Sequence, residues 1–143
     1  MAPDVVLRKL EALRDAVQRI EARCPVTLDA LLADRDAQDV LVLNLARAVQ
    51  SCVDIGVHLL AESGETPPST MNEVFDRLER AGRLSSGLAA RLRPAVGFRN
   101  VVIHRYDDID WGTALQVRNE RLRDFAAFAA EMRPTTHPPA GRN

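Results

Sequence analysis

The residues best suited to chemistry lie in one short stretch, which contains Arg99, Asn100, His104 and Tyr106. Arginine carries a permanent charge and a planar set of donors that fits a phosphate group, and histidine accepts or donates a proton near neutral pH. Together these two side chains are the minimal set for metal-free cleavage of a phosphodiester. The residue types therefore indicate phosphate chemistry, although a solvated helix face can have the same composition by chance.

The spacing places these four residues on one face of a predicted helix. On a wheel of about 100° per residue, the opposite face holds three apolar side chains: Phe98, Val101 and Val102. Asn100 and His104 are four residues apart and can touch, and Arg99 and Tyr106 share an edge two turns apart. Ile103 lies among the polar four, which indicates a contact surface or a groove rather than open solvent.

The same stretch is rich in positive charge. From Arg80 to Tyr106 the chain has six arginines and no Asp or Glu: Arg80, Arg83, Arg91, Arg93, Arg99 and Arg105. The whole chain has a net charge of -1, which argues against coating of nucleic acid through overall charge but permits a local basic patch. We therefore predict that this helix is the electropositive part of a near-neutral protein.

The hydrophobic periodicity and the capping residues predict an all-α fold. Five helices are expected: about 4–24, about 35–62, Thr70 to Gly82, Ser85 or Ser86 to about Tyr106, and Asp110 to Met132. A short turn capped by Thr27 follows the first, and Pro94 should kink the fourth or lie near a break. The result is an antiparallel bundle of four to five main helices plus a short helix. It forms one domain over 1–133, followed by a flexible tail over 134–143.

Several other functions are not favoured. The N-terminal residues lack a basic segment followed by an apolar one, so we expect no signal peptide. The longest apolar run, Phe125 to Ala130, is far below the roughly 20 residues that span a bilayer. Cys24 and Cys52 form no C-x-x-C pair and are predicted to be buried thiols. The three histidines, His58, His104 and His137, have no metal-ligand spacing. We expect a cytoplasmic protein with no membrane association, no metal and no cofactor.

The segment Val96 to Asp107 has the sequence Val-Gly-Phe-Arg-Asn-Val-Val-Ile-His-Arg-Tyr-Asp. It closely resembles the signature of HEPN proteins, an arginine and a polar residue followed by a histidine, in the HepT version with a tyrosine two residues after the histidine. The length, the following Ile109-Asp110 pair and the order of helices are similar to that family across nearly the whole chain. The resemblance implies an HEPN-type bundle and a metal-independent endoribonuclease, the toxin of a type VII-like toxin–antitoxin pair.

The resemblance also implies roles for individual residues. In such a reaction the ribose 2′-hydroxyl attacks the adjacent phosphate, which needs a base, an acid and a cation. His104 is expected to transfer a proton, Arg99 to stabilise the phosphate, and Asn100 to orient His104 or the substrate. Three further arginines are expected to bind RNA: Arg91, Arg93 and Arg105.

One histidine per chain leaves one proton-transfer role empty, so we expect a symmetric homodimer whose two motif helices share a basic cleft. In the HepT family the tyrosine that matches Tyr106 is modified with AMP by an MntA-like nucleotidyltransferase antitoxin, although Tyr106 could merely pack at the helix end. Trp111 is expected to anchor a helix start in the bundle. Two alternatives remain: a catalytically silent helical partner of a nucleotidyltransferase, and a purely structural dimeric bundle.

Overall fold

The computed structural model describes residues 2–133. The predicted tail over 134–143, which includes His137, lies outside the described residues. The part described consists of helices and connections, without strands, which confirms the predicted all-α class. In chain order the elements are α1 (Ala2–Arg23), α2 (Leu28–Leu32), α3 (Arg35–Glu62), α4 (Met71–Arg80), α5 (Ser86–His104), the 3-10 turn η1 (Tyr106–Asp108), α6 (Trp111–Glu120) and α7 (Leu122–Met132).

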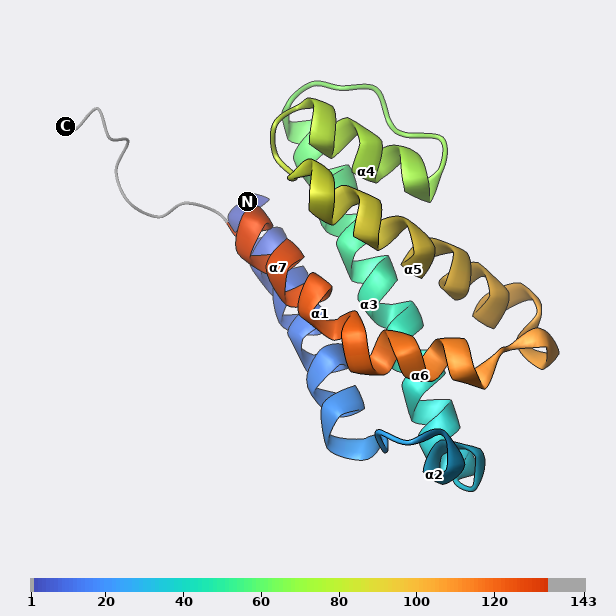
Figure 1. The fold of residues 1–143 in the computed structure, drawn as a ribbon. Coiled ribbons are helices and arrows are strands. Elements are labelled where there is room, and N and C mark those ends of the chain that lie inside the picture. The colour runs from blue at the N-terminus through green and yellow to red at the C-terminus, as the bar shows by residue number, and fades with distance from the viewer. Residues whose placement is uncertain (1, 134–143) are drawn as a thin grey trace.

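The long helix α3 is the centre of the bundle (Figure 1). α3 packs along α1 and runs antiparallel to it. α2, with a short connection on each side, links the two helices. α4 and α5 pack against other parts of α3, and α7 contacts α1, α3 and α5. α6 lies against α2 at the end where α3 begins. This arrangement brings Arg99, on the second half of α5, into contact with Gln50 near the middle of α3.

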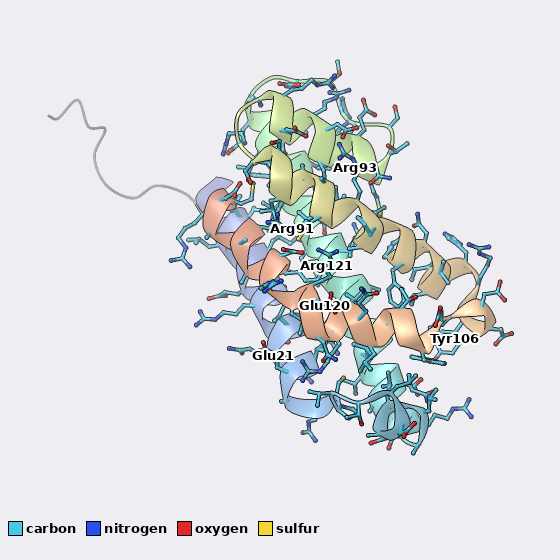
Figure 2. All side chains as sticks on the ribbon, in the orientation of Figure 1. Glu21, Arg91, Arg93, Tyr106, Glu120 and Arg121 are labelled. Atoms are coloured by element: carbon cyan, nitrogen blue, oxygen red, sulfur yellow. The ribbon has the colours of Figure 1, made fainter. Side chains whose placement is uncertain are left out.

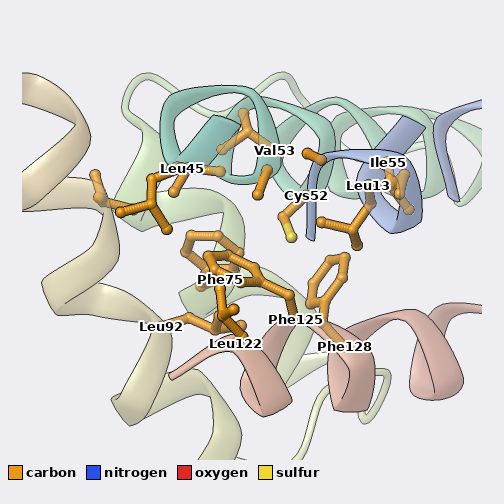
Figure 3. Packing of buried hydrophobic residues seen from close by; sticks show 14 of the residues in the cluster. Leu13, Leu45, Cys52, Val53, Ile55, Phe75, Leu92, Leu122, Phe125 and Phe128 are labelled. Atoms are coloured by element: carbon orange, nitrogen blue, oxygen red, sulfur yellow. The ribbon is translucent and has the colours of Figure 1, made fainter. Parts of the chain in front are cut away.

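The core consists mainly of aliphatic side chains from α1 and α3, closed by three phenylalanines (Figure 3). Phe75 of α4 and Phe128 of α7 meet edge to face, with ring centroids 6.1 Å apart, a geometry that aromatic pairs prefer. Cys24 and Cys52 are free and buried, which confirms their prediction as ordinary thiols. Burial raises the pKa of the Cys52 thiol, so that it stays protonated and unreactive.

The predicted helix starts are confirmed by hydrogen bonds from the backbone to the capping side chains. Thr27 accepts from the Ala30 amide at 3.3 Å, Asp34 from Ala37 at 3.0 Å, and Thr70 from Glu73 at 3.1 Å. Asp110 caps α6 by accepting from Gly112 at 2.9 Å. Gly82, at φ 75°, supplies the left-handed residue just after α4, where the sequence predicted the end of that helix.

The last predicted helix is in fact two helices. α6 ends at Glu120 and α7 begins at Leu122, with Arg121 at φ -112° and ψ -8° between them. The two halves bind different neighbours: Arg118 of α6 donates to the carbonyl of Pro25 at 3.2 Å, whereas Asp124 of α7 pairs with Arg91. One straight helix cannot follow both surfaces. α5, by contrast, continues through Pro94 without a break.

Within the described residues, α3 alone is long and apolar enough to cross a membrane by length and composition, with a mean hydropathy of 1.5 over 18 residues. However, 61% of that window is buried inside the bundle. The central helix of a helical bundle is apolar on most of its circumference because neighbouring helices surround it. The apolar character of α3 is therefore explained by its place in the core.

Candidate functional site

The last two turns of α5 present the residues on which the sequence analysis centred. Arg99 is half-buried, whereas Asn100 and His104 are exposed. Arg99 donates from Nη2 to Gln50 Oε1 on α3 at 3.0 Å, and from Nη1 to Asn100 Oδ1 at 3.4 Å. Its Nε is buried and has no acceptor among the described residues. The guanidinium is thus held on α3, while the imidazole of His104 is accessible at the end of the same helix.

A chain of polar contacts through α3 to α1 holds the Arg99 side chain in place. Gln50 accepts from Arg99 and donates from Nε2 to Asp54 Oδ1 at 2.9 Å. The other oxygen of Asp54 forms an ion pair with Lys9 Nζ on α1 at 3.1 Å. These contacts connect α5, α3 and α1, and they restrict the orientation of the guanidinium.

The side chain of Asn100 hydrogen-bonds to Arg99. Among the described residues no hydrogen bond joins Asn100 to His104, although both lie on α5 with the expected spacing. The side-chain oxygen of Asn100 instead accepts from Arg99. Asn100 therefore binds the cation of the site.

The position of Tyr106 also differs from the prediction. α5 ends at His104, Arg105 leaves the helical region at φ -144° and ψ 58°, and Tyr106 begins the turn η1. The expected edge shared by Arg99 and Tyr106 on one helix is consequently wrong. An acidic run with a cap at Asp110 follows, and this run forms the turn that redirects the chain into α6.

The Tyr106 side chain bends back to α3 and is 43% exposed. Its hydroxyl donates to Asp39 Oδ1 at 2.7 Å. This hydrogen bond, with burial and the negative charge of Asp39, raises the pKa of Tyr106 above its ordinary value, and Arg35 opposes part of the shift. The phenol is therefore protonated at neutral pH.

A hollow of about 370 Å³ lies beside the tyrosine, between the start of α3 and η1. Its lining comprises Leu32, Ala33, Arg35, Gln38, Tyr106, Asp107 and Trp111. Trp111 also packs against the hydrophobic core, which confirms its role as an anchor of the helix start. A second hollow, of about 500 Å³, opens between α1 and α3 on the other side of Asp39.

The arginines of α5 do not form one continuous patch. Arg91 forms an ion pair with Asp124 of α7 at 2.9 Å, and Arg93 pairs with Asp76 of α4 and lies 4.0 Å from Glu79. Arg91 and Arg93 lie on the first half of α5, far from Tyr106 (Figure 2). Arg105, between His104 and Tyr106 of the motif, is exposed. The stretch that has no acid in the sequence thus has acidic neighbours in space, which pair with Arg91 and Arg93.

The donor set at the site favours acid–base and electrostatic chemistry. Across residues 2–133, no group of three or more His, Cys, Asp or Glu side chains is placed to hold a metal ion. His58, half-buried on α3, lies 3.6 Å from Glu62 on its own helix. The site itself offers one imidazole, one anchored guanidinium, a side-chain amide and a phenol.

Sequence reasoning missed two residues of this site, Gln50 and Asp39. Both lie on α3, between 49 and 67 positions before the residues they contact. Each is an ordinary polar residue of a long helix, Gln50 half-buried and Asp39 exposed. No sequence signal could have identified them without the packing of α5 against α3.

An all-helical bundle that presents Arg-Asn-x-x-x-His-x-Tyr at the end of a late helix has the features of the HEPN class of ribonucleases. Comparison with known families agrees: the profile described as "Ribonuclease HepT-like" matches residues 13–132. The chain belongs to this family. It is accordingly an enzyme, a ribonuclease of the HEPN type.

Individual relatives support this assignment. The chain is 26% identical over 127 residues to an mRNA nuclease HepT of Shewanella oneidensis, covering 87% of this chain and 93% of that protein. It is 28% identical over 130 residues to a tRNA nuclease HepT of Aphanizomenon flos-aquae, covering 91% and 88%.

Solved structures agree on the fold. A tri-AMPylated Shewanella oneidensis HEPN toxin in complex with an MNT antitoxin superposes with a TM-score of 0.82 at 25% identity, over 90% of this chain and 96% of that one. The cytosolic protein YutE of Bacillus subtilis, of unknown function, has the same fold at 10% identity, with a TM-score of 0.78 over 92% and 93% of the two chains.

Proposed function

We propose that this chain is a metal-independent endoribonuclease and the toxin of a toxin–antitoxin pair. The observation that carries the proposal is the geometry of α5, where Arg99 is anchored on α3 and His104 is exposed five residues later. The relatives in Shewanella and Aphanizomenon are an mRNA nuclease and a tRNA nuclease, respectively. RNA is therefore the expected substrate class.

In the proposed reaction the ribose 2′-oxygen bonds to the adjacent phosphorus, and the 5′-oxygen leaves and takes up a proton. His104 transfers a proton in one of these two steps. Arg99 stabilises the negative charge that develops on the phosphate oxygens, because its guanidinium is already oriented by Gln50. Asn100, whose oxygen is occupied by Arg99, directs its amide to the substrate.

The RNA backbone on either side of the scissile bond requires further cations. We assign phosphate contacts to Arg91, Arg93 and Arg105, as the sequence indicated. Arg105 is exposed between His104 and Tyr106, so it is the first of these expected to contact RNA. Arg91 and Arg93 would have to share their guanidinium groups with Asp124 and Asp76.

We propose that the active form is a symmetric homodimer, because one chain supplies one histidine where the reaction needs both an acid and a base. Two large apolar side chains support an interface at this face. Ile103 on α5 is 52% exposed and Leu43 on α3 is 57% exposed. Both lie in the segments bracketed by the Arg99–Gln50 and Tyr106–Asp39 contacts, and a second copy would remove them from water.

We further propose that a nucleotidyltransferase antitoxin inhibits the enzyme by attaching AMP to Tyr106. The solved Shewanella toxin is tri-AMPylated and bound to an MNT antitoxin. Tyr106 has the exposure that such a modification requires. The added phosphate would place negative charge near Arg105 and the motif, where it competes with the phosphates of RNA.

Cleavage of RNA by the purified protein in the presence of EDTA tests the enzymatic proposal. We expect cleavage by the wild type, its loss in His104→Ala, and its retention in the matched control His58→Ala, which removes a half-buried histidine on α3. Cleavage that survives His104→Ala would contradict the proposed role of His104. A wild type that binds a nucleotidyltransferase but cleaves no RNA would favour the alternative of a catalytically silent partner.

A mixed dimer tests the shared site. When an Arg99→Ala subunit is combined with a His104→Ala subunit, a composite site gives the heterodimer an activity that neither homodimer has. If the protein is a monomer at the concentrations at which it cleaves RNA, the shared site is wrong.

A further inference from the structure

The hydrogen bond between Tyr106 and Asp39 joins a hydroxyl to a carboxylate that could accept its proton. The phenol is the donor and the carboxylate of Asp39 is the acceptor, at 2.7 Å. Asp39 is exposed, and it comes from a different element, α3, so it is not a local turn contact within η1. A nucleophilic hydroxyl already bonded to a carboxylate is the arrangement in which general-base assistance operates.

We propose that Asp39 of this chain accepts the Tyr106 proton when the tyrosine is modified, so that the toxin itself activates the group that its antitoxin targets. The inference rests on the proposed modification of Tyr106 and deepens it. It assigns a role in the transfer to a residue outside the Arg-His-Tyr motif, on the protein that is modified.

The step is a nucleotidyl transfer from a nucleoside triphosphate, which the antitoxin binds. The Tyr106 oxygen forms a bond to the α-phosphorus, the bond from that phosphorus to the bridging oxygen of pyrophosphate breaks, and pyrophosphate leaves with the electron pair. The phenolic proton passes to an oxygen of Asp39 and then to solvent. No oxidation or reduction occurs, and atoms and charge balance with the triphosphate as the only co-reactant.

The charges around the pair explain why a base is needed. Asp39 and Asp107 stabilise the protonated phenol and Arg35 favours the phenolate, with the balance on the protonated side. A neutral phenol is a weak nucleophile, so loss of its proton must accompany attack on phosphorus. Arg35 also lines the hollow beside Tyr106, where it can neutralise the phosphodiester once this has formed.

The substitution Asp39→Asn distinguishes two possible roles of Asp39, that of a base and that of a hydrogen-bond acceptor only. The amide oxygen of asparagine still accepts the hydrogen bond from Tyr106 but cannot take its proton. The MNT antitoxin of the Shewanella pair, with Mg²⁺ and ATP, serves as the transferase, and mass spectrometry measures AMP on Tyr106. We expect the maximal rate to fall about 100-fold in Asp39→Asn, with KM for ATP unchanged. Asp36→Asn, one helical turn away on α3, is the matched control. Equal rates for Asp39→Asn and wild type would overturn the proposal.

A second measurement needs no transferase. The chain has one tyrosine, so acetylation by N-acetylimidazole can be measured at Tyr106 alone by peptide mass. If Asp39 accepts the proton, Asp39→Asn slows acetylation about 10-fold at neutral pH. If Asp39 only stabilises the protonated phenol, the same variant lowers the pKa of Tyr106 and speeds acetylation, which refutes the proposal. If the antitoxin leaves the wild-type protein unmodified, that result counts against the proposed regulation. The acetylation rates still decide whether Asp39 accepts the proton of Tyr106.

Discussion

The role of Arg91 can be tested directly, because the sequence predicts that it binds RNA whereas in the structure it forms an ion pair. Its partner, Asp124 in the first turn of α7, is a carboxylate only 4% exposed. Arg91 Nε lies 2.9 Å from Asp124 Oδ1, and Arg121 lies 3.6 Å from Oδ2, which is itself buried without a hydrogen-bond donor. Replacing Arg91 with alanine therefore leaves a buried charge with one remaining cation, Arg121, at 3.6 Å.

The cost of Arg91→Ala follows from this geometry. Removing one partner of a fully buried ion pair destabilises a protein by about 3–5 kcal/mol. Here the Arg91 side chain is 47% exposed and Arg121 remains, so we expect about half of that, roughly 2 kcal/mol. For a domain of this size the midpoint of thermal unfolding should fall by about 8 °C.

Thermal unfolding followed by circular dichroism measures the effect. Arg83→Ala is the matched control, because Arg83 is exposed and has no ion pair within residues 2–133. In the Arg91→Ala background, Asp124→Asn removes the unpaired charge and should recover stability. A midpoint for Arg91→Ala equal to that of Arg83→Ala would refute the reasoning. RNA affinity measured well below the midpoint shows whether Arg91 also contacts phosphate.

Three further predictions concern packing, the support of Arg99 and pH. Gly56→Ala should destabilise by about 1–3 kcal/mol in urea unfolding, because the new methyl would overlap Val74 Cγ1. Gly97→Ala, with nothing within 4 Å, should stabilise by about 0.5–1 kcal/mol. The reverse order of stabilities would contradict the packing of α3 on α4. Gln50→Leu should lower kcat/KM for RNA cleavage about tenfold, roughly 1.4 kcal/mol, and unchanged cleavage would mean that Arg99 needs no support from α3. The folded protein raises the pKa of Tyr106, so the protonated phenol stabilises the fold below the pKa of about 10 that it has in the unfolded chain. This stabilisation is lost as the pH rises through the pKa of the folded state. The urea midpoint of the wild type should therefore fall over this pH range, and a midpoint that does not change with pH would contradict the prediction.

The helices themselves could be predicted from local sequence. The starts of α3 after Asp34 and of α4 after Thr70 each depend on a side-chain oxygen that accepts from the backbone amide three residues later. The end of α4 depends on Gly82 and its left-handed backbone. Such signals lie within one turn of the helix ends, and the structure confirms them.

The break at Arg121 could not be predicted in the same way. The apolar pattern continues from Leu115 to Met132, and neither Gly nor Pro interrupts it. The helix divides because α6 docks on α2 and α7 on α1 and α5. The choice of docking surface is a property of the assembled bundle.

For the candidate site, the sequence indicated the residue types and the structure added the partners that these residues contact. Arg99, Asn100 and His104 could be selected from their types and spacing, because these residues lie within two turns of a single helix. The end of α5 at His104, which removes Tyr106 from that helix, depends on a turn whose tyrosine is bonded to α3.

The sequence by itself determined the all-helical class, most helix limits, the family and the motif, since each depends on neighbours a few residues apart. Only the tertiary structure decided that Gln50 orients Arg99, that Asp39 binds Tyr106, and that acids from α4 and α7 neutralise Arg93 and Arg91. These contacts join residues from 17 to 67 positions apart. Their pairing is fixed by how the helices pack against one another, which no local pattern encodes.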